Sequence, residues 1–345
     1  MCAGHLERDL SDIRRKWIPD ARLGVWEVTM EGGRLVGCTT SRQGLQALRR
    51  FAAVAGLAAE VGLLPDASVG DDRAAVVTAA IAPLLEAPDV RADRVSEALH
   101  GEALAVLEER SGGGGEGGGG GAGWLRVRAA DGYHAWTHAG YVARGPEDWA
   151  TDWIERAGAR SHGAELRFDD GRLRLPIGAR LAARRDGSVE AADGRIGIVV
   201  AGTVRPVAEL AAEARLVAVP EWAWRWLGGA PYRWGGRTEW GIDCSGFVQA
   251  SYAARGVELP RDGDQQALAG RSVPMSEEGT GYEAGDLLCF ADGLRVSHVA
   301  LWAGAGRVVH AVLACGGVAS EDLFTDAPRM ASLRERLVTV RRLKA

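Results

Sequence analysis

The sequence predicts a multidomain chain with a small N-terminal α/β domain, two small β-barrels and a C-terminal α+β domain that carries the chemistry. Three observations lead to this fold class. The 345 residues are more than one domain usually holds. Short β runs separated by turn residues fill the middle of the chain. A helix followed by a hairpin, with reactive side chains on both, fills the last third. We expect the four domains at residues 1–88, 89–145, 146–220 and 221–345.

The first domain is predicted from one hairpin and two helices. Strand-like runs at residues 22–30 and 34–39 flank Glu31-Gly32-Gly33, a sequence that favours a tight turn. An amphipathic helix follows, with one apolar stripe formed by Leu45, Leu48, Ala52 and Ala55. The Ala-rich segment 74–85 is predicted to form a second helix. No chemistry can be assigned to this domain from its residues.

Residues 89–145 and 146–220 read as two small barrels, because short β runs and turn residues alternate in both. The first contains a nearly pure glycine tract, residues 112–123, which we interpret as a flexible loop between strands. A phosphate-binding loop is a poor alternative because no strand leads in and no Lys-Ser or Lys-Thr follows. The cluster of Trp222, Trp224 and Trp226 is expected to form a buried helix between the second barrel and the last domain.

The last domain offers a cysteine nucleophile. Cys244 directly precedes an apolar helical stripe, and Asp243 stands at the N-cap position. A thiol in the first helical turn is favoured as an anion by the helix dipole. The carboxylate of Asp243 opposes this effect, so a histidine must outweigh it.

Two histidines qualify as partners. His298 and His310 lie on strand-like runs, residues 295–302 and 307–313, joined by a Gly-rich turn that favours a hairpin. If the hairpin pairs residues whose numbers add up to an even value, the rings of His298 and His310 lie on the same face of the sheet. A shift of the pairing register by one residue would place them on opposite faces. We expect His298 to activate Cys244 and His310 to orient His298.

Composition limits the partners. The formal charge of −5 and a pI near 5.9 argue against nucleic acid and against an anionic membrane. Five scattered cysteines fit neither a disulfide framework nor a zinc site, and neither a metal nor an organic cofactor is implied. Because no export signal or long apolar run is present, we expect a cytoplasmic protein.

These motifs resemble a known family. Asp-Cys-Ser-Gly-Phe at 243–247, Ser-His-Val at 297–299, the third motif residue His310 and the segment 231–236 resemble the NlpC/p60 family of bacterial cell-wall cysteine peptidases. The resemblance covers the last third of the chain and implies a papain-like α+β catalytic domain. Residues 89–145 resemble bacterial SH3-like domains, and residues 146–220 resemble a more divergent copy.

The domain order is similar to one branch of that family, cytosolic γ-D-glutamyl-L-diamino-acid endopeptidases that cut murein peptides with a free N-terminal L-Ala. The resemblance implies a set of substrate-binding residues: Asp243, Ser245, Asp262, Tyr133, Glu102 and Trp234. Two departures bear on amine recognition, Gly263 where the branch has Ser and Ala135 where it has Gly. Each residue also has a structural reading: Asp262 as a helix cap, Tyr133 as barrel core and Glu102 as a solvated turn charge.

Two other functions stay open at this point. One is a broader peptidoglycan hydrolase or amidase that acts on the intact wall, and the other is a non-catalytic wall-binding module. The identity of the diamino acid, meso-diaminopimelate or L-Lys, and the oligomeric state are also open.

Overall fold

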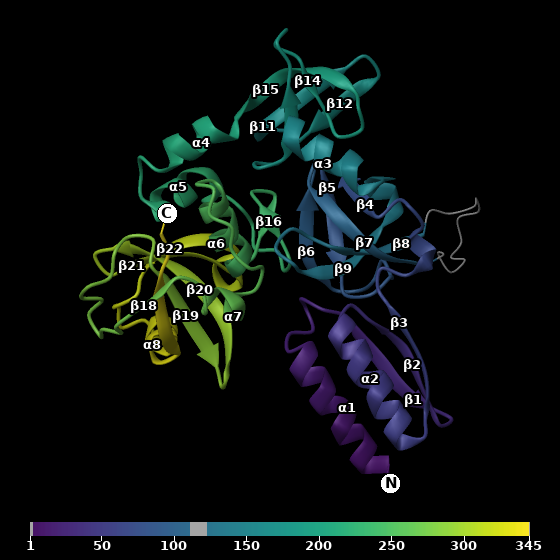
Figure 1. Ribbon diagram of the computed structural model, residues 1–345. Coiled ribbons are helices and arrows are strands. Elements are labelled where there is room, and N and C mark those ends of the chain that lie inside the picture. Colours follow the sequence, from purple (N-terminus) through teal and green to yellow (C-terminus); the bar gives the residue numbers. More distant parts are fainter. Residues whose placement is uncertain (1–2, 111–122, 345) are drawn as a thin grey trace. The chain divides into compact units, whose positions relative to one another are not determined.

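The computed structural model describes residues 3–110 and 123–344 and divides the chain into two compact units (Figure 1). The first unit comprises Met1–Val76, Leu85–Ala92 and Ala103–Thr151, and the second comprises Val77–Leu84, Asp93–Glu102 and Asp152–Ala345. Each unit has a hydrophobic core of its own.

The predicted hairpin and amphipathic helix of the first domain are confirmed. Strands β1 (Trp26–Glu31) and β2 (Arg34–Thr39) pair antiparallel, and the two turn glycines between them have positive φ. Helix α2 (Arg42–Ala55) is capped by Ser41 and buries Leu45, Leu48 and Ala52. Helix α1 (Ala3–Trp17) and strand β3 (Ala58–Leu63), which pairs parallel with β2, complete this domain.

The predicted helix at 74–85 is wrong, because this segment forms strands β4 (Ala74–Val77) and β5 (Ile81–Leu85). All four residues of β4 are buried. A strand buried on both faces has no alternating pattern and resembles a short helical run in sequence. Strand β4 pairs with β7 (Ala103–Arg110) at Ala74↔Ala105, so this sheet begins before the predicted boundary at residue 88.

The sheet continues with short strands, as predicted. Strand β7 pairs antiparallel with β8 (Trp124–Arg128), and β8 pairs with β9 (His134–His138). The remaining elements of this region are the single turn η1 (Ala67–Val69), strand β6 (Arg94–Leu99), the single turn η2 (Ala139–Tyr141) and strand β10 (Val142–Gly145). Of the predicted glycine loop, only Gly123 lies within the described residues.

Residues after helix α3 (Glu147–Arg156) form a small closed barrel. Its strands are β11 (Ala159–Phe168), β12 (Gly171–Arg174), β13 (Arg180–Ala183), β14 (Val189–Glu190) and β15 (Ile196–Pro206). The ring closes because β11 pairs with both β13 and β15, while β14 joins these two. This agrees with the predicted barrel, and its likeness to SH3 domains stays a prediction.

Two helices, α4 (Val207–Ala214) and α5 (Val219–Leu227), lead into the last domain. The expectation that all three tryptophans of α5 are buried is wrong. Trp222 is 6% exposed, but Trp224 is 48% and Trp226 is 37% exposed. Only the face that includes Val219, Trp222 and Leu227 meets the core, because one side of a surface helix stays in solvent.

The last domain packs helices on a six-stranded sheet with the order β18-β23-β19-β20-β21-β22 (Figure 1). The strands are β18 (Arg271–Val273), β19 (Leu287–Asp292), β20 (Arg295–Gly304), β21 (Arg307–Val312), β22 (Gly317–Asp322) and β23 (Leu337–Arg342). The small strands β16 (Arg237–Thr238) and β17 (Gly241–Ile242) precede helix α6 (Cys244–Ala253). Helices α7 (Gly263–Gln266) and α8 (Pro328–Glu335) and the turn η3 (Leu313–Cys315) complete it.

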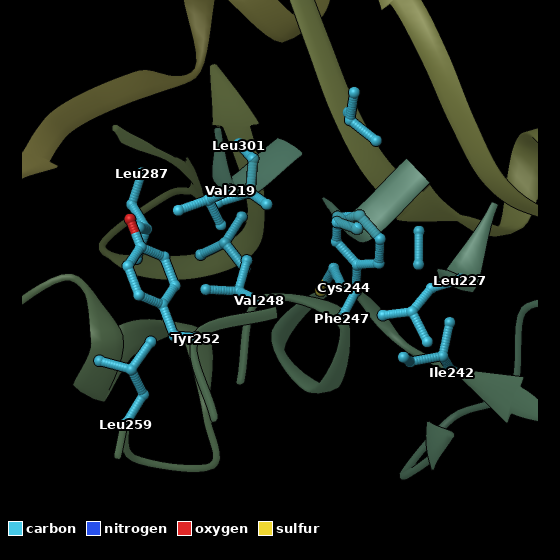
Figure 2. Packing of buried hydrophobic residues seen from close by; sticks show 14 of the residues in the cluster. Val219, Leu227, Ile242, Cys244, Phe247, Val248, Tyr252, Leu259, Leu287 and Leu301 are labelled. Atoms are coloured by element: carbon cyan, nitrogen blue, oxygen red, sulfur yellow. The ribbon is translucent and has the colours of Figure 1, made fainter. Parts of the chain in front are cut away.

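Helix α6 is held by the core beneath it. Phe247, Val248 and Tyr252 are almost fully buried and pack with Leu301 of β20 in one cluster (Figure 2). The Tyr252 hydroxyl donates to the Gly285 carbonyl at 2.6 Å. Helix α6 is therefore fixed against β20 and β21. None of the described helices is long and apolar enough to cross a membrane.

Candidate active site

Cys244 is the first residue of α6 and belongs to the buried cluster in Figure 2, with 8% of its surface exposed. Asp243 caps the helix by accepting from the Gly246 N–H at 2.7 Å, as predicted. Burial first, and then the charge of Asp243, raise the pKa of the Cys244 thiol to about 11. Backbone hydrogen bonds from Ser245 and Val299 oppose this rise. The expected lowering by the helix start is therefore outweighed, and the resting thiol is protonated.

The same Val299 backbone bond brings the sulfur next to the residue that follows His298 in β20. The Nε2 of His298 lies 2.8 Å from the Nδ1 of His310 on β21. The hairpin pairs Leu301 with Val309, an even sum, so the prediction that both rings share a face is confirmed. They lie diagonally across the strands and not directly opposite, and Nδ1 of His298 is the ring nitrogen outside this contact.

The hydrogen-bond chain continues beyond the two histidines. The Nε2 of His310 lies 2.9 Å from Glu321 Oε2 on β22, and the other oxygen of Glu321 accepts from Arg329 on α8. Sequence reasoning missed both residues. The available signal was the register of β22, where His310 pairs with Ala319 and Glu321 therefore falls on the same face.

The protonation of this chain follows from burial and charge. Burial lowers the pKa of His298 to about 3, with further lowering by His310, Arg336 and Arg329. The hydrogen bond from His310 and then the bond and charge of Arg329 lower the pKa of Glu321 to about 2. At neutral pH His298 is an uncharged base and Glu321 is a carboxylate. An uncharged ring has the free lone pair that a general base needs.

Asp243 has more partners than its cap. Its Oδ2 accepts from Arg261 at 2.6 Å and from the Gly235 N–H at 2.9 Å. Arg261 also donates to the Ser245 hydroxyl at 2.7 Å and is 1% exposed. Sequence reasoning missed Arg261. Asp243 and Ser245 therefore already serve an internal ion-pair network, and their contact with a substrate amine stays a prediction.

Asp262 lies directly after Arg261 and caps α7 in a capping box with Gln265, which matches its structural reading. Asp262 is only partly buried. The departure at Gly263 has a packing reason. A Cβ there would lie 3.1 Å from Cγ1 of Val299, the residue that hydrogen-bonds the thiol.

The remaining predicted substrate residues are not brought together with Cys244 by any described contact. Glu102 accepts from the Leu99 N–H at 3.1 Å and pairs with Arg237 at 3.1 Å, so it is an ion-pair partner and not a free turn charge. Trp234 is 64% exposed on the loop before α6. Tyr133 is 7% exposed and belongs to the other compact unit. Their substrate roles stay predictions.

A pocket of about 380 Å³ opens beside the histidines. Its lining includes Tyr232, Ser297, His298, Arg329 and Arg336. Burial first, and then the neighbouring Cys244 and Asp243, raise the pKa of Tyr232 to about 12. The Tyr232 hydroxyl is therefore a proton-bearing donor near the sulfur.

One cluster in the described part of the chain has the residue types and spacing of a metal site, Glu27, Cys38 and Glu108. Arg126 and Arg110 pair with both carboxylates. The charges that would attract a cation are thus already balanced by protein groups.

The fold and the site define a class of protein, a hydrolase domain with a thiol at the start of a helix and a histidine pair on the sheet that this helix packs against. Residues 229–342 match the model of the NlpC/P60 family. The C-terminal domain therefore belongs to the NlpC/P60 family of peptidoglycan-related peptidases.

Similar proteins support this family assignment, one over a short stretch of the chain and one over a long stretch. The γ-D-glutamyl-L-lysine dipeptidyl-peptidase of Bacillus subtilis is 44% identical over 85 residues, which cover 24% of this chain and 27% of that protein. Dipeptidyl-peptidase 6 of Lysinibacillus sphaericus is 29% identical over 265 residues, which cover 69% of this chain and 88% of that protein. The matches to the first curated relatives thus span only about a quarter to a half of their length.

A solved structure shows the same fold over a longer stretch. The crystal structure of an NlpC/P60 family protein from Bacillus cereus superposes with a TM-score of 0.57 at 19% identity. It covers 78% of this chain and 99% of that chain.

Proposed function

We propose that this chain is a cytoplasmic cysteine peptidase that cleaves the bond between γ-D-glutamate and an L-diamino acid in murein peptides with a free N-terminal L-Ala. The observation that carries the proposal is the hydrogen-bond chain from His298 through His310 to Glu321, together with the Cys244 thiol that the backbone of Val299, the residue after His298, hydrogen-bonds. Two similar proteins, a γ-D-glutamyl-L-lysine dipeptidyl-peptidase and a dipeptidyl-peptidase, support this bond class.

The chemistry follows from the protonation states. Nδ1 of His298 takes the Cys244 proton while the sulfur attacks the γ-carbonyl carbon. The oxyanion is stabilised by N–H groups at the start of α6 and by the Tyr232 hydroxyl. When the C–N bond breaks, His298 returns the proton to the leaving amine. A water that loses its proton to the same ring then hydrolyses the thioester and regenerates the thiol.

Charged side chains of opposite sign determine where the two ends of the substrate bind. A free α-ammonium needs an acidic partner when it leaves water, and Asp262, with Asp243 and Ser245 near it, supplies that side. The pocket beside His298 contains Arg329 and Arg336, which suit the carboxylates of the leaving diamino acid. The substrate thus binds with its amine towards α7 and its diamino acid towards α8.

The test is mass spectrometry after incubation with L-Ala-γ-D-Glu-meso-diaminopimelate and with its N-acetylated twin. We expect L-Ala-D-Glu from the first peptide only. Cys244→Ala is expected to abolish release, while Cys38→Ala, a matched change in the other unit, retains it.

Other outcomes identify the alternatives. Cleavage of both twins, or release from intact sacculi, would favour a broader wall hydrolase. No cleavage of any murein peptide by the wild-type chain would favour a binding module. Loss of turnover with a chelator but not with a thiol alkylating agent would overturn the cysteine mechanism.

A further inference from the structure

Glu321 contacts neither Cys244 nor His298 directly, yet it belongs to the hydrogen-bond chain that leads to His298. It lies on β22 opposite Val308, two residues from the Ala319 that pairs with His310. Its side chain is 19% exposed and its two oxygens have separate partners, His310 and Arg329. Sheet register therefore holds the carboxylate against the far nitrogen of His310.

We propose that Glu321 is a positioning residue that fixes the tautomers of both histidines and so directs the unprotonated nitrogen of His298 at Cys244. The inference rests on the proposed function for its catalytic consequence. The tautomer of each ring follows from the hydrogen bonds alone and does not depend on the proposed function.

The logic follows the donors along the chain. A carboxylate only accepts, so Nε2 of His310 must carry its hydrogen. In the neutral His310 ring Nδ1 is then a lone pair, and it accepts from Nε2–H of His298. This leaves Nδ1 of His298 without a hydrogen. That nitrogen is the one able to remove the thiol proton.

Arg329 fixes which oxygen of residue 321 can only accept a hydrogen bond. A guanidinium only donates, so the oxygen of residue 321 that faces Arg329 must accept. Together with the hydrogen bond from His310, this ion pair lowers the pKa of Glu321 to about 2, and the acceptor state persists at neutral pH. The carboxylate also offsets the positive charge that His298 gains while it holds the thiol proton.

The sharpest variant is Glu321→Gln. Arg329 would hold the new amide oxygen, so the amide NH₂ would face Nε2 of His310. His310 would then carry its hydrogen on Nδ1 and donate to His298, whose own hydrogen would move to Nδ1 and face the thiol. The hydrogen of His298 would thus move from Nε2 to Nδ1, while the size and shape of residue 321 would stay almost the same.

The prediction for catalysis is a fall in kcat of about 100-fold with KM changed less than about threefold, the scale seen when a group that orients a reacting residue is lost. Glu335→Gln, an exposed carboxylate on α8, is the matched control and should keep the wild-type kcat. Arg329→Leu added to Glu321→Gln should recover part of the loss, because the amide oxygen is then free to turn towards His310.

A spectroscopic reading separates positioning from mere support of the fold. In ¹⁵N-labelled protein, we expect one-bond N–H correlations at Nε2 of both His298 and His310, and a shift of both hydrogens to Nδ1 in Glu321→Gln. The rate of Cys244 alkylation should fall with it. Tautomers unchanged in the variant, whether or not kcat falls, would overturn the proposal.

The ring spectra and the alkylation rate need no substrate. If the wild type cleaves no murein peptide, the proposed function fails while these two measurements still decide the role of Glu321. If cleavage occurs but the tautomers stay fixed without the carboxylate, only the present inference fails.

Discussion

The guanidinium of Arg261 and the carboxylate of Asp243 form a buried ion pair, with Nη2 2.6 Å from Oδ2, directly at the start of the helix that carries Cys244. Their side chains are 1% and 6% exposed. A buried charge is tolerated only when it is paired and hydrogen-bonded. The pair therefore fixes the loop around Gly235 and the first turn of α6 relative to each other.

The first prediction removes one member of this pair. Arg261→Met leaves the Asp243 carboxylate buried without its cation, and we expect the free energy of unfolding to fall by about 3–5 kcal/mol. Adding Asp243→Asn, which keeps a capping side chain, should restore a large part of this loss. Urea denaturation measures both variants.

Arg185→Met is the control, because Arg185 is exposed in the barrel region and should change stability by less than about 0.5 kcal/mol. An Arg261→Met protein as stable as this control would show that the ion pair does not hold the helix start.

The second prediction concerns the glycine of the Cys-Ser-Gly run. A Cβ at Gly246 would lie 2.1 Å from the Gly236 carbonyl oxygen, which is backbone and unable to swing away. Gly246→Ala must therefore displace the start of α6, and we expect a loss of about 1–3 kcal/mol in stability together with a lower kcat.

Its matched control is Gly229→Ala, where a Cβ meets nothing within 4 Å and φ is not positive. That variant should unfold at or slightly above the wild-type temperature. Equal behaviour of the two alanine variants in thermal unfolding would contradict the close contact.

The elements of the candidate site could be predicted from sequence because local patterns encode them. Asp243 is a cap one residue before an apolar stripe, and the Gly-rich turn with even-sum pairing places His298 and His310 on one face. Both patterns depend on neighbours within a few residues or across one short turn.

The missed parts depend on longer-range packing. Glu321 reaches His310 only through the register of β22, which is set after a turn ending at Gly316 in a left-handed conformation. Arg261 meets Asp243 from 18 residues away. The error at β4 has a similar origin, because burial on both faces comes from its sheet neighbours and not from its own pattern.

The third prediction concerns stability at acid pH. His298 titrates near 6.5 when unfolded and at about 3 in the folded chain. Between these values the unfolded state binds more protons, so the free energy of unfolding falls as pH drops from about 6.5 to 3, by at most about 1.4 kcal/mol per pH unit.

His298→Gln should flatten this part of the pH dependence. The other groups that shift the pKa of His298 remain in the variant: Arg329, Arg336, His310 and Glu321. Urea unfolding of both proteins at pH 7 and pH 5 measures the difference, and parallel losses of stability would rule out the lowered pKa of His298.

The fourth prediction separates the two roles of Asp262, as a cap and as a partner of the substrate ammonium. Asp262→Ser keeps a good N-cap for α7 but removes the negative charge. If the carboxylate meets the free amine, KM for the peptide with a free L-Ala should rise by about 10-fold or more, because a charge-assisted hydrogen bond is lost. Stability should change by only a few tenths of a kcal/mol. Steady-state kinetics and thermal unfolding of the same preparation provide both readings. A variant with wild-type KM and wild-type stability would leave Asp262 with the cap alone and transfer amine recognition to other residues.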